Sequence, residues 1–336
     1  MKKQSVVTVF LLAAVTIFSL AGVSEAAKQT VRLAGIFPPD YYVMKAYYKM
    51  VDKIKNRTKG ELDIKIFPSN QLGSYDQAFQ EVMRGTIEMM GNYATSRFNK
   101  KFEIASYPGM VTGFADVAKL IARDSPYHTF LKDAYKECGV VYIGSFVDAL
   151  MGCAISKRKN VTAPYDTKSK GLVARVAAVE AWRKWYGAMG YQVATVPFAE
   201  VFSSMQTGII DCDTGAGPEA AYATLKDVMG SYIQYNNVFA VNDFIISKSL
   251  WDSLDEKTQK IIYEAFDEVV ASELNDAENS HKEYIDKMQK AGIKVLTPKP
   301  EEQKAMIDIA KKQIWPQFYG VVSKEILDRI EKCLAK

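Results

Sequence analysis

Apolar and polar positions follow two rhythms in the first part of the chain. Some runs alternate strictly, which is typical of half-buried strands, and others place an apolar residue every three or four positions, which is typical of helices. Ser74 caps one helical run, and Gly60 and Gly85 each follow the end of one. The pattern predicts strands at residues 30–35, 62–67 and 87–90, with helices at about 42–58 and 75–84 between them.

The same order returns in the second half of the chain. Strands are predicted at residues 172–176, 191–196 and 209–210, with helices at 179–188 and around 201–205. The segments FQEVMRGTIE (79–88) and FSSMQTGIID (202–211) align at one constant offset, with aromatic, glycine, isoleucine and acidic positions in common. We interpret this as an internal duplication. It predicts two α/β lobes, with a cleft between them at the carboxyl ends of parallel strands.

Further apolar runs connect the two repeats. Runs at 140–146, 153–156 and 233–247 predict strands that cross from lobe to lobe. A helical pattern at 254–291 loses its apolar stripe near 275–283, as expected of a helix that bridges two bodies. Two more helical patterns, separated near Pro316, complete the chain. The fold class is therefore α/β, with two lobes, crossing strands and a long lobe-spanning helix.

The chain length is more than one core usually fills, so we divide it into two discontinuous lobes. The first lobe is predicted to contain residues 27–150 and 241–280. The second lobe is predicted to contain residues 151–240 and 281–336.

The first 26 residues are interpreted as a cleavable signal peptide. Lys2 and Lys3 precede an apolar core at 6–21, and Ser24 and Ala26 are small residues at the positions that a signal peptidase reads. Export to the periplasm is therefore expected. Without this segment the chain keeps 41 basic and 38 acidic residues, a net charge of +3. We expect no nucleic-acid partner and, since no later run is long enough to span a bilayer, no stable membrane insertion.

Signals for catalysis or metal binding are few. The chain has only two histidines; we expect His281 to be solvated and His128 to lie in a turn before a helix. No HExxH or GxSxG motif occurs, and the four widely spaced cysteines show no CxxC pair. A disulfide and buried free thiols both remain open. We therefore predict that the protein is not an enzyme and uses no cofactor and no metal.

Arg175 is the most informative charged residue, because it lies inside the apolar run at 172–179. Arginine is almost never buried without a partner. One interpretation is a salt bridge inside the lobe to Asp211 or Asp213. The other is a guanidinium that offers two parallel hydrogen bonds to the carboxylate of a ligand.

Other candidates follow predicted strand ends. The loop DTGAGPE (213–219) contains Asp213 and Gly215, and it is either a simple turn or a loop that lines a ligand. It lacks the pattern of a phosphate-binding loop. Three aromatic residues, Phe37, Tyr93 and Phe198, each follow a strand, and we expect them to form walls of the cleft.

Two stretches resemble a known family. The segment KGELDIKIFPSNQLGSYDQAFQEVMRGTIEM, and KGLVARV followed by PFAEVFSSMQTGIID, resemble the substrate-binding proteins of tripartite ATP-independent periplasmic (TRAP) transporters of the dicarboxylate-binding (DctP-like) type. The resemblance covers nearly the whole chain after the signal peptide. It implies a two-lobed periplasmic binding protein fold of type II-like form. It also implies an organic acid ligand and, as partners, the subunits of a membrane permease driven by an ion gradient.

The resemblance also assigns residues. It implies that Arg175 pairs with the substrate carboxylate and that Phe198 lines the pocket. Many members carry a polar or aromatic ligand contact where this chain has Gly215, and a second arginine of some members is replaced within DALMGCAIS (148–156). We therefore expect a single carboxylate anchor in an apolar, aromatic pocket, which favours a monocarboxylate with an apolar or aromatic body. A ligand sensor and a binding protein of an ABC importer remain alternative functions.

Overall fold

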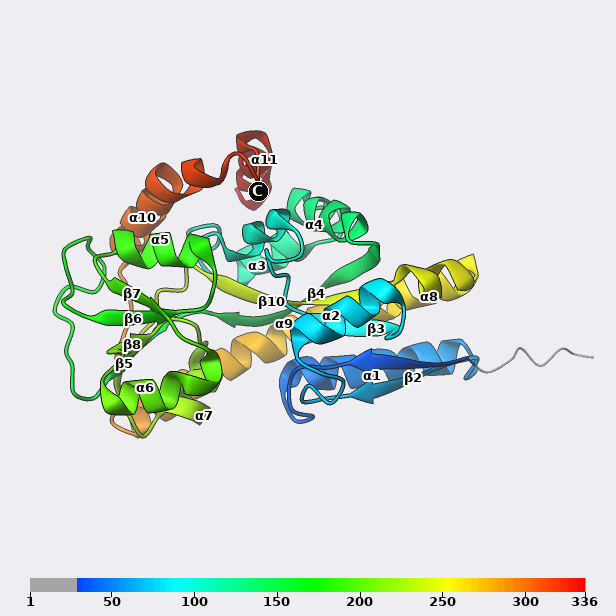
Figure 1. Cartoon of the computed structure of the whole chain (residues 1–336), viewed down its shortest axis with the longest axis horizontal. Coiled ribbons are helices and arrows are strands. Elements are labelled where there is room, and N and C mark those ends of the chain that lie inside the picture. Colours follow the sequence, from blue (N-terminus) through cyan, green and yellow to red (C-terminus); the bar gives the residue numbers. More distant parts are fainter. Residues whose placement is uncertain (1–28, 336) are drawn as a thin grey trace, which may run out of the picture.

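The computed structural model describes residues 29–335 and shows two lobes, each built around one β-sheet (Figure 1). The first sheet has the order β2-β1-β3-β10-β4, with strands β1 (Gln29–Ala34), β2 (Leu62–Phe67), β3 (Met89–Asn92), β4 (Val140–Leu150) and β10 (Phe239–Ser247). The second has the order β11-β9-β5-β8-β6-β7, with strands β5 (Cys153–Ser156), β6 (Val173–Val176), β7 (Gln192–Thr195), β8 (Cys212–Asp213), β9 (Met229–Ile233) and β11 (Lys294–Leu296). The α/β, two-lobed prediction is confirmed.

The predicted repeat is present as one topology built twice. The unit β1–α1–β2–α2–β3 uses helices α1 (Tyr42–Arg57) and α2 (Tyr75–Arg84), and the unit β6–α5–β7–α6–β8 uses α5 (Glu180–Ala188) and α6 (Val201–Thr207). In both sheets the first strand of the unit lies between the other two, and all three are parallel. In both, an antiparallel strand follows on the far side of the third, β10 in one lobe and β5 in the other.

Two details of the repeat have the same physical cause in both copies. Helices α2 and α6 each end at a glycine, Gly85 or Gly208, whose φ of 78° or 88° lies in the left-handed region that glycine adopts without strain. The acid that closes each repeat accepts a backbone hydrogen bond from the first strand. Glu88 accepts from the Arg32 N–H at 2.8 Å, and Asp211 accepts from the Val173 N–H at 2.9 Å.

The third strand of each repeat begins two or three residues later than the sequence predicts. Ile87 and Ile210 are buried as expected, but both lie in the turn between helix and strand. The pairing with β1 or β6 begins only at Met89 and Cys212. Burial of an isoleucine in this turn therefore mimics the start of a strand.

Long strands and one long helix connect the lobes, as predicted. Strands β4 and β10 pair antiparallel along most of their length before the chain passes to the second sheet. Helix α9 (Glu256–Lys290) packs against α1 and β4 in the first lobe and against α7 (Pro218–Leu225) and β11 in the second. Figure 1 shows this helix running behind both lobes. Among the described residues no helix is both long and apolar enough to cross a membrane.

The remaining helices surround the first sheet and the top of the second. They are η1 (Lys100–Ser106), α3 (Phe114–Ile121), α4 (Pro126–Glu137), η2 (Phe198–Glu200), α8 (Lys248–Ser253), α10 (Pro300–Ile309), η3 (Ala310–Ile314), η4 (Trp315–Phe318) and α11 (Lys324–Leu334). The division into lobes at the predicted boundaries remains a prediction. Helix α11, which it assigns to the second lobe, packs against α3 and α4 (Figure 1).

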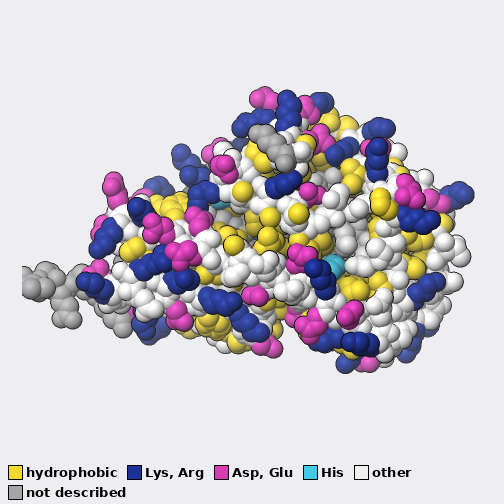
Figure 2. Space-filling view, turned by 180° about the vertical axis from the view of Figure 1, so that it is seen from behind, with side chains coloured by type: hydrophobic (Ala, Val, Ile, Leu, Met, Phe, Trp, Pro, Cys, Tyr) yellow, Lys and Arg dark blue, Asp and Glu magenta, His cyan; other side chains and the backbone are white. Residues whose placement is uncertain are grey.

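The distribution of surface charge agrees with the small net charge of the sequence, and the cysteines follow one of the two alternatives left open above. Figure 2 shows Lys and Arg interspersed with Asp and Glu over one face of the molecule. All four cysteines are free thiols, with Cys153 and Cys212 buried on the neighbouring strands β5 and β8. The predicted signal peptide lies outside the described residues.

Candidate functional site

The candidate residues lie on two edges that face each other across the boundary between the lobes. In the second lobe they lie at the carboxyl ends of β6, β7 and β8, and in the first lobe they follow β1 and β3. Ala149 of β4 lies beside Gly217, at the place where a side chain on that glycine would point. Burial raises the pKa of Tyr75 in α2, and the positive charge of Arg175 opposes this rise. Tyr75 in the first lobe and Arg175 in the second therefore interact electrostatically across the boundary.

Arg175 is held from two sides inside the second lobe. Its Nε donates to the Val196 carbonyl at 2.7 Å, and its Nη1 donates to Asp213 Oδ1 at 3.2 Å. The side chain is only 5% exposed. Within residues 29–335, Nη2 donates no hydrogen bond. The guanidinium is therefore oriented by the protein but keeps donors for an outside acceptor.

Asp213 resolves one of the alternatives left open by the sequence. The internal salt bridge of Arg175 is made to Asp213, whereas Asp211 instead bonds to the Val173 N–H and pairs with Lys159. Burial raises the pKa of Asp213, and the charge of Arg175 opposes that rise. Its second oxygen, Oδ2, is buried and has no hydrogen-bond partner within the described chain. Within the described chain, Arg175 and Asp213 thus form a salt bridge through one carboxylate oxygen only, and the second oxygen of Asp213 stays without a partner.

The two lobes differ at this pair although their register is the same. In the second sheet Arg175 lies opposite Asp213, and Ala174 lies opposite Cys212. In the first sheet the corresponding partners are Ala34 opposite Met90 and Leu33 opposite Met89, all buried and apolar. The scaffold therefore accommodates an apolar pair at this position. Local folding does not demand an ion pair there.

Gly215 leaves room for the guanidinium. A Cβ atom at this position would overlap Nη1 of Arg175, and its backbone N–H donates to Asp213 Oδ1 at 3.3 Å. The arginine therefore occupies the space that a side chain at this position would take. The Phe198 ring lies 5.7 Å from Arg175 Cζ and is 46% exposed, which leaves a ring face beside the cation.

The first lobe contributes aromatic rings and a carboxylate. Phe37 stacks on Tyr41 with ring centroids 4.4 Å apart and meets Tyr93 edge-on at 6.0 Å. Tyr41 donates to Asp148 Oδ1 at 2.6 Å, and Tyr93 donates to Asp148 Oδ2 at 2.5 Å. Phe37 and Tyr93 thus lie close together, and their role as a wall of the cleft stays a prediction.

Asp148 is the residue that sequence reasoning missed. It lies in DALMGCAIS, where the family resemblance predicts the loss of an arginine and of its polar contact. The sequence patterns assign no role to Asp148, whose carboxylate lies buried in this segment. The strand is predicted to end at residue 146, but apolar positions continue to 150 around Asp148, which is the same signal that identified Arg175.

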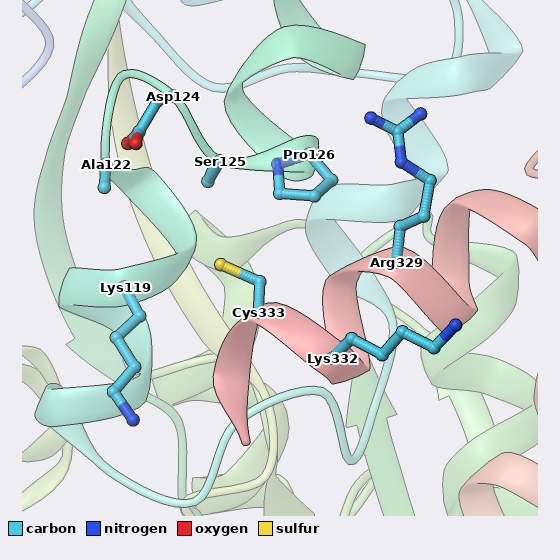
Figure 3. Close-up of a pocket in the computed structure, with 8 residues that line it drawn as sticks. All are labelled: Lys119, Ala122, Asp124, Ser125, Pro126, Arg329, Lys332 and Cys333. Carbon is cyan, nitrogen blue, oxygen red and sulfur yellow. The ribbon is translucent and has the colours of Figure 1, made fainter. Parts of the chain in front are cut away.

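The structure has a cavity between the lobes and another away from the predicted site residues. A cavity of about 220 Å³ lies between the lobes, bounded by Ser96 and Glu103 on one side and by Arg183 and Thr195 on the other. A second cavity of about 500 Å³ lies between α3, α4 and α11 (Figure 3). Its lining includes Lys119, Arg329 and Cys333, and none of the predicted site residues.

The histidines differ from the prediction. His128 lies in α4 and His281 in α9, both largely buried, and desolvation lowers the pKa of each to about 4. The expectation that His281 is solvated is wrong, because it packs edge-on against Phe114 and hydrogen-bonds Gln234. Within residues 29–335, no group of three or more His, Cys, Asp or Glu side chains could hold a metal ion.

Comparison with known proteins gives one consistent result. The sequence model described as "Bacterial extracellular solute-binding protein, family 7" (DctP) matches residues 33–320. The C4-dicarboxylate-binding periplasmic protein DctP of Shewanella loihica is 23% identical over 287 residues, which cover 83% of this chain and 82% of that protein.

Solved structures have the same fold. A TRAP periplasmic solute binding protein from Ochrobactrum anthropi aligns with a TM-score of 0.83 at 20% identity, covering 93% of this chain and 96% of that one. Another from Desulfovibrio salexigens, with bound orotic acid, aligns with a TM-score of 0.79 at 22% identity, covering 91% and 98% of the two chains.

Proposed function

Because the chain belongs to the bacterial extracellular solute-binding protein family 7, the DctP family of TRAP solute-binding proteins, we propose that it captures an organic acid anion between its lobes. In this proposal the protein acts in the periplasm after removal of residues 1–26. It then delivers the ligand to the subunits of a membrane permease driven by an ion gradient. It performs no chemistry on the ligand.

The observation that carries this function is the Arg175–Asp213 pair at a register position that is apolar in the other lobe. A buried cation costs desolvation energy unless it is paired, and a scaffold that tolerates Ala34 and Met90 has no structural need of it. Arg175 is held at Nε and Nη1, so the free hydrogens of Nη1 and Nη2 can form two parallel bonds to a ligand carboxylate.

The body of the ligand lies, in this proposal, against the aromatic rings. Phe198 lines the carboxylate end from the second lobe, and Phe37 and Tyr93 form the opposite wall. Gly215 and Asp213 shape the space around the guanidinium. Among the predicted site residues, all within the described chain, Arg175 is the one cation, so a monocarboxylate with an apolar or aromatic body fits them. Two of the relatives named above point to carboxylates: the Shewanella loihica protein is named for binding C4-dicarboxylates, and the Desulfovibrio salexigens structure holds orotic acid.

Closure of the lobes would strengthen the anchor. Water leaves the boundary as the two edges approach, and a charge-assisted hydrogen bond gains strength in the lower dielectric. The ligand stabilises the closed form only by the difference between its affinities for the closed and open forms. A ligand held at Arg175 and against first-lobe rings contacts both lobes. It therefore binds the closed form more tightly than the open form.

Thermal unfolding of the purified protein, freed of bound ligand, tests this function. The panel contains organic acids, each beside its neutral amide and alcohol analogues. A ligand at about 100 times its Kd stabilises the folded protein by about 2.7 kcal/mol, which gives a clear rise in Tm. We expect at least one carboxylate to raise Tm and its neutral analogues to leave Tm unchanged. A protein that responds to neutral analogues equally, or to no acid, contradicts the proposal.

A further inference from the structure

Asp148 presents an unusual acceptor at the first-lobe edge of the site. The residue lies near the end of β4 and is only 6% exposed, and each of its oxygens accepts one tyrosine hydroxyl. Each carboxylate oxygen can accept a further hydrogen bond, and so can the tyrosine oxygens. Because each tyrosine donates to the carboxylate, polarisation makes the tyrosine oxygens stronger acceptors. This edge therefore recognises a hydrogen-bond donor or a cation, and it repels a second carboxylate.

Aromatic rings surround this carboxylate. We call the group Phe37, Tyr41, Tyr42 and Tyr93 the aromatic wall. Tyr42 stacks on Tyr41 with centroids 4.5 Å apart, and their hydroxyls lie 3.5 Å apart. All four side chains are half-buried, so each keeps some surface exposed. Aromatic faces beside a carboxylate are the surroundings in which proteins bind ammonium groups.

The other charges near Asp148 have the same sign. Burial raises the pKa of Asp148, the tyrosine hydrogen bonds lower it, and the charge of Glu219 in α7 raises it further. Glu273 of α9 is fully buried beside the same strand, where its carboxylate accepts the Val147 N–H at 3.0 Å. Within the described chain, Asp148 forms no ion pair with a lysine or arginine.

We propose that the ligand is a zwitterion, with its carboxylate on Arg175 and an ammonium group, primary or alkylated, between Asp148 and the aromatic wall. This inference rests on the proposed function, since it takes the carboxylate anchor from there. A cation at the Asp148 end neutralises a buried carboxylate that has no counter-ion among residues 29–335, and charge complementarity of this kind decides between ligands. A hydroxyl group could also bond to Asp148, but it would leave that charge uncompensated.

Calorimetric titration of the whole exported chain with matched ligands tests the inference. The set contains ω-amino acids of different chain length, each beside its N-trimethyl, hydroxyl and unsubstituted analogues. The best zwitterion should bind about tenfold more tightly than its unsubstituted analogue, or more. Equal or tighter binding of the unsubstituted or hydroxylated acid overturns the zwitterion but leaves the carboxylate anchor intact. Binding of no carboxylate overturns the proposed function as well.

The variant Asp148→Asn keeps the shape of the side chain and removes its charge. The preference for the zwitterion should fall to less than about threefold, while the affinity for the unsubstituted acid stays the same or rises. Asp252→Asn, which removes an exposed carboxylate that pairs with Lys248 on α8, serves as the control and should keep the preference. An unchanged preference in Asp148→Asn overturns the assignment.

A second variant keeps the test independent of folding. Tyr93→Phe removes the hydroxyl that donates a hydrogen bond to Asp148 and keeps the aromatic ring. It should lower in part the preference for the zwitterion, measured as the ratio of its Kd to that of the unsubstituted acid in the same variant. If Asp148→Asn fails to fold, a full preference in Tyr93→Phe and in Tyr41→Phe overturns the proposal.

Discussion

The two repeats build the same scaffold, and they differ most at one pair of positions. In the first lobe Ala34 and Met90 lie side by side in the sheet; in the second, Arg175 and Asp213 occupy the corresponding places. The glycine that ends the second helix of each repeat, and the acid that bonds to its first strand, are common to both. Features shared by the copies therefore serve the fold. The ion pair, found in only one copy, serves a ligand in our proposal.

The largest effect that we predict concerns a buried carboxyl group without a cation, which sharpens the contrast with Asp213. Asp243 of β10 accepts hydrogen bonds from Tyr135 and Ser145, each at 2.6 Å, and burial raises its pKa to about 7. Between about pH 4, the pKa in the unfolded chain, and pH 7, the folded protein binds more protons than the unfolded chain. The contribution of the Asp243 carboxyl group to the free energy of unfolding is therefore lost as pH rises through this range.

The variant Asp243→Asn should remove this loss, which amounts to at most about 4 kcal/mol. Urea unfolding of both proteins at several pH values gives the difference in unfolding free energy. That difference should move in favour of the variant as pH rises. His128 and His281, whose pKa values are lowered to about 4, act with the opposite sign below about pH 6.5, but they cancel in the difference. A difference independent of pH would contradict the assignment.

The next effect concerns the geometry of the cation in the second lobe. Arg175→Lys keeps the charge but loses the planar group that bonds to Val196, to Asp213 and, in our proposal, to the ligand. The Kd for the best carboxylate should rise about 100-fold, or about 2.7 kcal/mol. Arg84→Lys, an exposed arginine that pairs with Glu81, should leave the Kd unchanged in the same titration. Near-normal affinity of Arg175→Lys would move the anchor elsewhere.

A smaller effect tests the space that the second lobe leaves for the guanidinium. In Gly215→Ala the new methyl group overlaps Nη1, so the guanidinium must shift. We expect the Kd to rise about tenfold, or about 1.4 kcal/mol. The matched control is Gly187→Ala in α5, where a Cβ meets no atom within 4 Å. If both variants bind equally well, the guanidinium does not need its observed position.

The smallest effect concerns what the copies share. Glu88→Gln and Asp211→Asn each weaken a hydrogen bond that a backbone N–H in the first strand of the repeat donates to a carboxylate. Each should cost about 1 kcal/mol of unfolding free energy, and neither should change ligand affinity. Urea unfolding and titration of both variants measure this. A large loss of affinity in Asp211→Asn would show that this acid serves the site and not only the scaffold.

Most of the fold could be predicted from the sequence because its periodicities are strong. Strands β2 and β5 have the predicted ends, and Ser74 caps α2 as expected. The starts of β3 and β8 could not be predicted, since strand pairing with a distant partner decides them and not the hydrophobicity of Ile87 and Ile210.

Fewer features of the candidate site than of the fold could be predicted from the sequence. Arg175 was found because a lone arginine in an apolar run is rare, whereas Asp148 was missed although its surroundings give the same signal. The partner of Arg175 was narrowed to two acids but not chosen, because the choice depends on the register between β6 and β8. The association of Tyr41 and Tyr93 with Asp148 joins residues far apart in the chain, and local patterns carry no information about it.

The most direct test of the central claim converts the second lobe to the composition of the first. The double variant Arg175→Ala/Asp213→Met should fold with an unfolding free energy within about 2 kcal/mol of the original, since an apolar pair replaces a buried ion pair. The same protein should bind its carboxylate ligand at least about 100-fold more weakly. A double variant that loses more than about 4 kcal/mol would make the pair structural, and one that still binds would place the carboxylate elsewhere.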